Sequence, residues 1–125
     1  MKKLIKSGSR FILGFGFLIF GLNGFFSFME TPPLAPEALA FVIALVKTGY
    51  MMPLVKAIEV VSGIMILAGG KTEFLGLVLL APVLVNIFLI HAVLDPAGLA
   101  LPIALVIMFK IRVWHHRDKY FHLFV

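Results

Sequence analysis

Two ionisable side chains stand inside an apolar stretch of this sequence. Lys56 and Glu59 interrupt residues 53–70, a run that otherwise consists almost entirely of apolar and small residues. A charged residue at the centre of a membrane helix costs roughly 2.5–3.5 kcal/mol, so its presence there requires a partner or a function. A spacing of three places the two side chains one turn apart on the same side of a helix. The stripe continues through Ser62 and Gly63, which predicts that a second helix packs closely against it.

Two interpretations of this pair stay open. In the first, the pair is structural and holds neighbouring helices in register, as some buried ion pairs do. In the second, it forms a polar pocket inside a helix bundle, where Glu59 relays a proton as the catalytic residue and Lys56 binds the polar head of a ligand. Lys before Glu is the weaker order for a pair within one helix, so we expect further partners from other helices.

Four further polar residues interrupt the other apolar runs: Asn23, Ser27, Asn86 and His91. We expect all four to line the same pocket and to bind its ligand. At 1.5 Å per residue, Asn23 lies roughly 9 Å and Asn86 about 12 Å from the outer end of its helix, against about 10 Å for Glu59. Three helices thus bring polar groups to one height, which predicts a pocket open toward the outside of the membrane.

The spacing of Asn86 and His91 allows other roles. The two are five positions apart, about 140° around an ideal helix, so they share a pocket only if Pro82 distorts the turn. A contact between His91 and Asp95, one turn later, is the favoured alternative. Asn23 has an alternative role as a hydrogen-bonding link between two helices.

The composition is that of an integral membrane protein with a single domain, residues 1–125. Apolar residues make up 62% of the chain and charged residues 14%, whereas a soluble domain is about 45–50% apolar. The chain has no cysteine, which excludes disulfides and thiolate-ligated metal. The net charge of +5 indicates contact with lipid headgroups rather than nucleic acid, because Lys and Arg stand at the ends of the apolar runs. Three histidines among basic residues near the C-terminus predict a tail that faces headgroups rather than a metal site: His115, His116 and His122.

We predict an all-α fold, a bundle of four transmembrane helices with a short interfacial helix between the first two spans. The predicted spans are residues 11–29, 53–70, 74–94 and 98–113, and the short helix covers 37–48. The short helix follows the proline-rich segment Thr31 to Pro36 and is too short to cross a bilayer, which takes about 20 residues. Residues 71–73 read as a tight polar loop after two glycines. Four glycines are expected to let helices approach closely: Gly14, Gly16, Gly21 and Gly24.

Basic residues predict the orientation. With four spans, both termini lie on the same side as the loop that contains Lys71. The opposite loops, around residues 30–36 and 95–97, hold acids and prolines but no basic residue. Both termini are therefore predicted to be cytoplasmic, in a bacterial inner (plasma) membrane. Trp114 and Tyr120 are the predicted interfacial anchors.

Several of these segments together resemble the DoxX-like family of small membrane proteins, over nearly the whole chain. The segments are Phe20-Gly-Leu-Asn-Gly-Phe-Phe26, Thr31-Pro-Pro33, Thr48-Gly-Tyr50, Pro53-Leu-Val-Lys56 with Glu59 and Gly63, Leu80-Ala-Pro-Val-Leu-Val-Asn-Ile-Phe-Leu-Ile-His91, Pro96-Ala-Gly98, and a tail with Arg117 and Phe121. The resemblance implies a four-helix membrane bundle with a short extra helix after the first span. Some relatives are quinone-linked subunits, including a thiosulfate:quinone oxidoreductase, and others are partners in membrane redox complexes. Most small members have no assigned reaction.

Three hypotheses on function follow. In the first, the pocket binds a quinone or a similar amphiphile and belongs to a membrane redox system. No flavin, haem or metal motif is present, so a membrane or soluble redox partner would supply the electrons. In the second, the chain is a non-enzymatic scaffold or assembly factor. In the third, it is a small-solute or lipid transporter, which one short chain would need oligomers to form.

Overall fold

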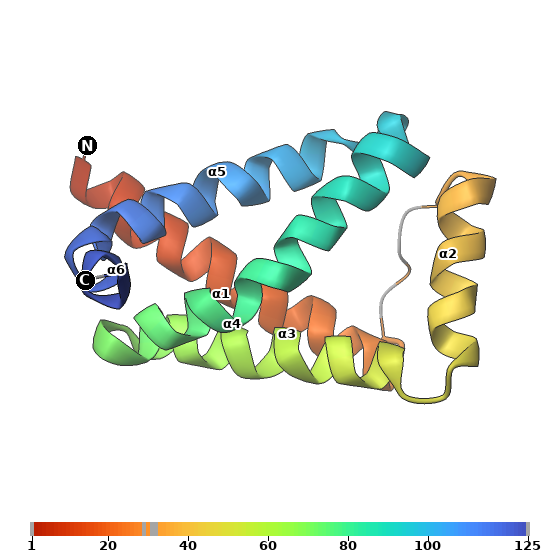
Figure 1. Ribbon diagram of the computed structural model, residues 1–125, viewed down its shortest axis with the longest axis horizontal. Helices are drawn as coiled ribbons and strands as arrows, with labels where there is room; N and C mark the ends of the chain where they lie inside the picture. Colours follow the sequence, from red (N-terminus) through yellow and green to blue (C-terminus); the bar gives the residue numbers. More distant parts are fainter. Residues whose placement is uncertain (1, 29, 31–32, 125) are drawn as a thin grey trace.

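The computed structural model describes residues 2–28, 30 and 33–124, and every regular element among them is helical (Figure 1). This confirms the predicted all-α class. The α-helices are α1 (Lys2–Phe26), α2 (Pro36–Lys47), α3 (Met51–Ala68), α4 (Gly70–Leu89), α5 (Ala100–His115) and α6 (Arg117–Phe124). Between α4 and α5 lie a π-helical turn, η1 (Ile90–Leu94), and a short 3₁₀-helix, η2 (Pro96–Gly98).

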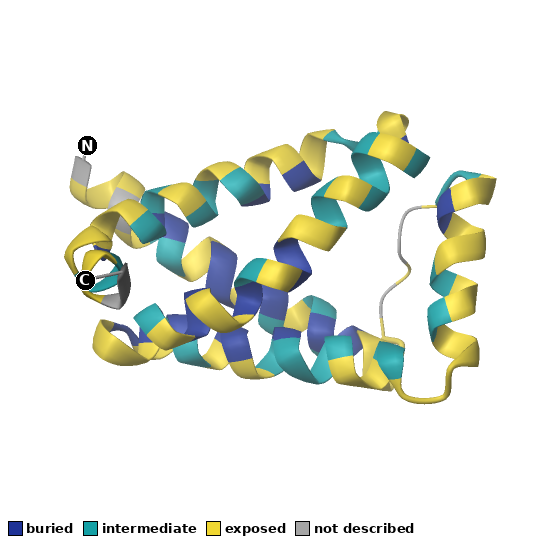
Figure 2. Cartoon of the chain, viewed as in Figure 1, coloured by how far each residue is buried: buried dark blue, intermediate teal, exposed yellow. Residues whose placement is uncertain are grey.

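Three helices in the described part of the chain are long and apolar enough to cross a membrane: Lys3–Phe26, Met51–Ala68 and Gly70–Leu94. They cover the first three predicted spans and indicate a membrane protein. Their outward faces are apolar and exposed, while buried residues gather where the helices meet (Figure 2). Such an apolar exterior is unfavourable in water and matches the hydrocarbon of a bilayer. The predicted fourth span falls on α5, which has 16 residues and is shorter than these three.

The bundle is arranged around the close contact between α1 and α3. A Cβ atom added to Gly63 of α3 would lie 2.7 Å from the carbonyl oxygen of Gly14 in α1, so the two backbones touch. A Cβ atom on Gly21 would likewise meet Val60 of α3, and one on Gly24 would meet the side chain of Lys56. The predicted close approach is therefore confirmed at Gly14, Gly21 and Gly24, whereas a Cβ on Gly16 would meet nothing within 4 Å.

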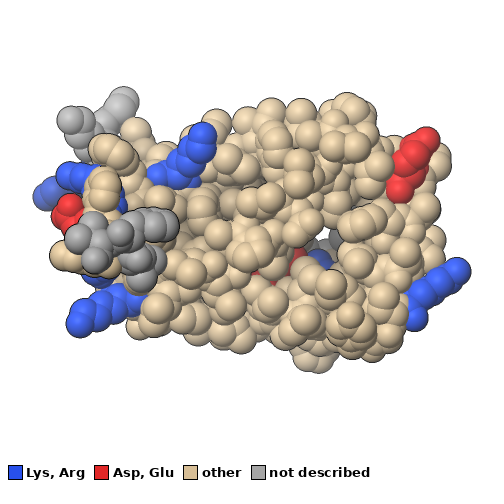
Figure 3. All heavy atoms as spheres, viewed as in Figure 1, with Lys and Arg blue, Asp and Glu red and all other residues tan. Residues whose placement is uncertain are grey.

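The other helices complete the bundle in a ring. α4 packs against α3 and α5, and α5 packs back against α1. The buried core lies between these four helices and includes Leu13, Phe17, Ile66, Leu77, Leu80, Leu84 and Leu105. The start of α1 and the end of α6 lie at one end of the bundle, and α2 runs crosswise at the other, where it contacts α3 and η1 (Figure 1). Basic side chains gather at the end that holds the termini (Figure 3).

The turn between α3 and α4 corrects the predicted boundary. Gly69 and Gly70 have φ of 79° and 61°, a left-handed conformation that glycine adopts readily. They reverse the chain at once, so α4 begins at Gly70 and residues 71–73 form its first turn. The prediction of a polar loop at 71–73 is therefore wrong, because the two glycines alone make the turn.

The other boundaries shift in smaller ways. α1 begins at Lys2, well before the predicted residue 11, and ends at Phe26. The predicted end of this span at Met29 lies outside the described residues, as do Thr31 and Pro32 of the linker. The last turn of the third predicted span is the π-helix η1 rather than regular α-helix.

Candidate functional site

The predicted pair forms and is buried in α3. The Nζ of Lys56 donates a hydrogen bond to Oε2 of Glu59 at 3.3 Å. The side chain of Glu59 is only 5% exposed, while that of Lys56 is 25% exposed. Among the described residues, Lys56 is the only polar partner of Glu59. Because a carboxylate has about four acceptor positions and an ammonium three donors, most of the bonding capacity of the pair is unused.

The stem of Lys56 lies across α1 at Gly24. A Cβ atom on Gly24 would lie 2.4 Å from Cγ and 2.5 Å from Cδ of Lys56, so only glycine leaves room for the lysine here. Asn23, the neighbour of Gly24, is buried, with 7% of its surface exposed. Asn23 is thus next in sequence to the residue on which Lys56 packs, and its predicted role in binding a ligand stays a prediction.

The surface is open near this site. Figure 3 shows a hollow between α2, α3 and α4, with an acidic and a basic side chain visible inside it. The side chain of Lys56 is 25% exposed, so it is partly accessible from the surface, whereas that of Glu59 is 5% exposed.

Asn86 forms a hydrogen bond within its own helix, α4. Its side chain is exposed, and Nδ2 donates to the carbonyl oxygen of Pro82, one turn back on the same helix, at 2.9 Å. The buried face of α4 instead carries Leu80, Val83 and Leu84. No hydrogen bond or ion pair joins Asn86 to Lys56 or Glu59 within the described chain, so its place in the pocket stays a prediction.

Ser27 directly follows the end of α1 at Phe26. Its side chain is exposed, and its φ of 51° turns the chain out of the helix. Its predicted role in binding a ligand stays a prediction.

His91 lies in the π-helical turn, half-buried. Its Nδ1 is 2.8 Å from the carbonyl oxygen of Ile87, so this nitrogen carries the proton in that hydrogen bond. A Cβ on Gly98 would lie 3.0 Å from Cδ2 of His91 and 3.1 Å from Oδ2 of Asp95, so both side chains flank Gly98. Within the described chain, however, no hydrogen bond or ion pair joins His91 to Asp95, and the expected contact is replaced by the bond to Ile87.

A second buried carboxylate, absent from the predicted site, lies at the end that holds the termini. Glu73 is 1% exposed and accepts two hydrogen bonds from Arg112, from Nε at 2.6 Å and from Nη2 at 2.7 Å. His116 contributes a third contact, from Nε2 to Oε1 at 2.8 Å. Both carboxylate oxygens are therefore engaged in short contacts by residues from other elements, in the bidentate geometry typical of Arg. We call these three residues the Glu73 cluster.

The Glu73 cluster corrects two predictions. The predicted polar loop contains Glu73, yet its side chain is buried, as is that of its partner Arg112. His116 was assigned to a headgroup-facing tail, and it is 6% exposed. The sequence did contain a signal, because Arg112, His116 and Tyr120 follow one another at spacings of four, which places them on one side of a helix.

Tyr120 packs against the cluster rather than serving only as an anchor. Its ring lies 4.6 Å from that of Phe74, and its hydroxyl is buried without a partner among the described residues. Burial, and secondarily the negative charge of Glu73, raise the pKa of Tyr120 to about 12. The neutral phenol is thus the form that this environment favours.

Comparisons with known proteins do not extend this description, since no protein-family model, curated protein or solved structure matches the chain. The class that the fold defines is a helical membrane bundle. Three carboxylates are buried among the described residues, and two of them, Glu59 and Glu73, have ion-pair partners and differ in how fully they are bonded.

Proposed function

We propose that the protein is a DoxX-like membrane protein of four spans, whose Lys56–Glu59 site binds a quinone or a similar amphiphile by its polar head. The observation that carries this proposal is the bonding of Glu59, which is almost fully buried and yet has a single partner at 3.3 Å. A buried charge is normally paired and fully hydrogen-bonded. A site with unused donors and acceptors beside an opening is suited to a polar ligand.

The position of the pair argues against a purely structural role. Lys56 and Glu59 belong to the same helix, three residues apart, so their ion pair does not connect α3 to a neighbour. A pair that holds helices in register would join two of them, as Glu73 and Arg112 do. The Lys56–Glu59 pair therefore contributes little to assembly and remains available for a ligand.

The membrane arrangement in this proposal includes α5 as the fourth span. α5 packs against both α1 and α4, and its Arg112 reaches Glu73 in the first turn of α4. Since α4 is a candidate span, a helix that lies along it and ends beside its start crosses the same hydrocarbon. α2, with 12 mostly exposed residues, lies at the interface at the opposite end. The basic end that holds both termini faces the cytoplasm of a bacterial cell.

Each residue of the site has a proposed role. The ammonium of Lys56 donates a hydrogen bond to a carbonyl of the ligand head, and Glu59 relays a proton to or from it. Asn23 lines the site from α1. The electrons that accompany the protons come from a membrane or soluble redox partner, because the side chains of the site do not carry them.

The proposal is tested by extracting the protein in native lipid and identifying retained small molecules by mass spectrometry. We expect a quinone or related amphiphile with the wild-type protein and its loss in Glu59→Gln and Lys56→Met, with folding kept. Lys47→Met, at an exposed position in α2, is the matched control and should retain the ligand. If Glu59→Gln prevents assembly while the folded fraction still binds, the pair is structural and the proposal is wrong.

A further inference from the structure

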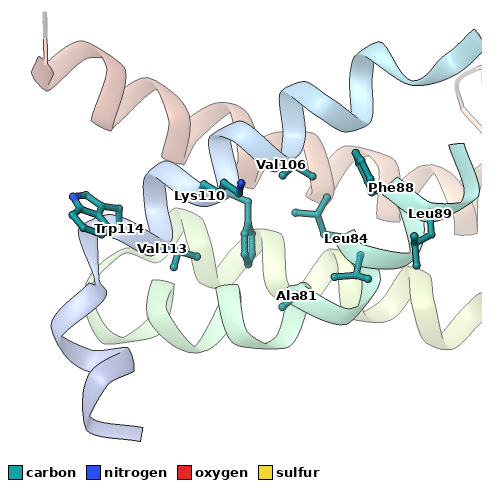
Figure 4. Close-up of a pocket in the computed structure, with 10 residues that line it drawn as sticks. Ala81, Leu84, Phe88, Leu89, Val106, Lys110, Val113 and Trp114 are labelled. Atoms are coloured by element: carbon teal, nitrogen blue, oxygen red, sulfur yellow. The ribbon is translucent and has the colours of Figure 1, made fainter. Parts of the chain in front are cut away.

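A second feature, remote from the Lys56–Glu59 site, is a groove of about 670 Å³ between α4 and α5 (Figure 4). Its walls are apolar, with Leu84 and Phe88 on α4 facing Val106 on α5. Lys110 is the only charged residue that lines it. Trp114 lies at the end of the groove nearest the C-terminal helix (Figure 4).

The polar end of the groove is lined by Lys110 and Trp114, and Arg117, outside the lining, packs on the Trp114 ring. Lys110 lies one turn before it on α5, is exposed, and has no hydrogen bond or ion pair within the described chain. Arg117 lies on the other side, with its guanidinium 5.0 Å from the centre of the Trp114 ring, and Nη1 donates to the Trp114 carbonyl at 3.1 Å. The charge of Arg112, by contrast, is already matched by Glu73.

We propose that the groove binds an anionic phospholipid, with an acyl chain between α4 and α5 and the phosphate between Lys110 and Arg117. The apolar walls match a hydrocarbon chain, and the unmatched cations at one end match an anionic head. Trp114 lies where indole rings are enriched, at the level of the headgroups. An apolar helix from a second copy of the chain would fill the walls but leave Lys110 without a counter-charge. This inference uses none of the residues of the proposed amphiphile site.

The chain provides its own probe, because Trp114 is its only tryptophan. We would reconstitute the protein in phosphatidylcholine vesicles that contain an equal fraction of brominated phosphatidylglycerol or brominated phosphatidylcholine. Bromine quenches indole fluorescence on contact, so the ratio of quenching by the two lipids measures the preference for the anionic head at Trp114. The ratio also cancels any change in the fluorescence yield of Trp114 between variants. We expect brominated phosphatidylglycerol to quench more strongly.

The variants Lys110→Gln and Arg117→Gln test the headgroup contact. We expect each to lower the preference for phosphatidylglycerol by about fivefold. Lys71→Gln removes the same charge at the same end of the molecule but outside the groove, and should leave the ratio unchanged. Glu59→Gln should also leave it unchanged, which separates this inference from the proposed function.

The variant Ala81→Leu tests the acyl-chain contact by narrowing the groove, since Ala81 lines it. We expect fewer retained lipids by native mass spectrometry, with the phosphatidylglycerol preference of those that remain unchanged. Equal quenching by the two lipids in the wild type, or an unchanged ratio in Lys110→Gln and Arg117→Gln, would overturn the proposal. Absence of quenching by either lipid, together with cross-linked dimers, would show that a second copy covers the groove instead.

Discussion

Glu59 and Glu73 are both almost fully buried in the same bundle, but their surroundings differ. Glu73 has three contacts of 2.6–2.8 Å from Arg112 and His116, whereas Glu59 has one of 3.3 Å from Lys56. The partners of Glu73 are 39 and 43 residues away and tie α4 to the C-terminal helices, while the partner of Glu59 is on its own helix. Burial alone therefore does not identify a functional carboxylate. The unused bonding capacity at Glu59 is the more informative feature.

The same substitution at the two sites gives the sharpest test of this comparison. We expect Glu73→Gln to lower the free energy of unfolding by about 3–5 kcal/mol, because it removes the buried carboxylate that Arg112 and His116 both contact. Glu59→Gln should cost less than about 1 kcal/mol, because it removes one long bond to a partly exposed lysine. Unfolding by SDS, followed by circular dichroism, measures both. Equal losses would mean that the two carboxylates do not differ in structural role.

Replacing the whole ion pair sharpens the interpretation of Glu73. In Glu73→Leu with Arg112→Leu, both members of the buried ion pair are removed together, so we expect the double variant to regain much of the stability lost in Glu73→Gln. The Glu73–Arg112 pair would then mainly specify how the helices are arranged and add little to the net stability of the fold. A double variant as unstable as the single one, in the same SDS titration, would contradict this and show that the bidentate bond itself stabilises the bundle.

Two glycines test whether the Lys56 site is separable from the packing around it. A Cβ at Gly63 meets backbone atoms of α1, so Gly63→Ala should destabilise the protein by about 1–3 kcal/mol. A Cβ at Gly24 meets the side chain of Lys56, which has rotamers to move into. Gly24→Ala should therefore cost less stability than Gly63→Ala while reducing ligand retention. Similar losses of stability in both, by SDS titration, would show that Lys56 is part of the helix contact.

Tyr120 gives the smallest expected effect, at the periphery of the Glu73 cluster. The pKa of Tyr120 is raised from 10.0 to about 12 in the folded protein. The unfolded chain therefore loses the phenol proton near pH 10, while the folded protein keeps it until about pH 12. Folding stability falls across this interval, because ionisation favours the unfolded state. Wild type should therefore lose stability between pH 10 and 12 relative to Tyr120→Phe. At pH 7 the variant should be as stable as wild type or slightly more so, because it removes a buried hydroxyl without a partner.

Ionisation of the Tyr120 phenol is measured by absorbance near 295 nm. The signal is the difference in absorbance between wild type and Tyr120→Phe. Subtracting the variant removes the signal of Tyr50, the only other tyrosine. A midpoint near pH 10 would mean that Tyr120 is not held against the cluster.

The helices themselves were largely predictable, because long apolar runs broken by glycine, proline and charge define membrane helices. The short helix at 37–48 was found within one residue of α2. The heights of Asn23 and Asn86 along their helices could be estimated from the sequence, but the direction of each side chain could not, because the face of a uniformly apolar helix is not encoded in its hydrophobic pattern. In the structure Asn23 is buried and Asn86 is exposed.

The spacing of Arg112, His116 and Tyr120 indicates a shared helix face, but the contact of that face with Glu73 could not be predicted from local pattern. Glu73 follows Gly69, Gly70, Lys71 and Thr72, which together read as a polar turn until the positive φ of the two glycines is known. Its partner Arg112 stands among basic residues that the positive-inside rule explains without any pairing. Only the tertiary arrangement shows which of these cations is buried, because the contact spans 39 residues of sequence.

The one-residue connection between α3 and α4 has a consequence for biogenesis. Two apolar helices joined only by Gly69 are expected to insert into a bilayer together, as a single hairpin. The connection is too short for one helix to insert before the other. The carboxylate of Glu73 stands at the tip of that hairpin, and both of its partners are synthesised much later. We expect the tip to stay at the aqueous boundary until Arg112 and His116 have been synthesised, and to become buried when the last two helices pack against Glu73.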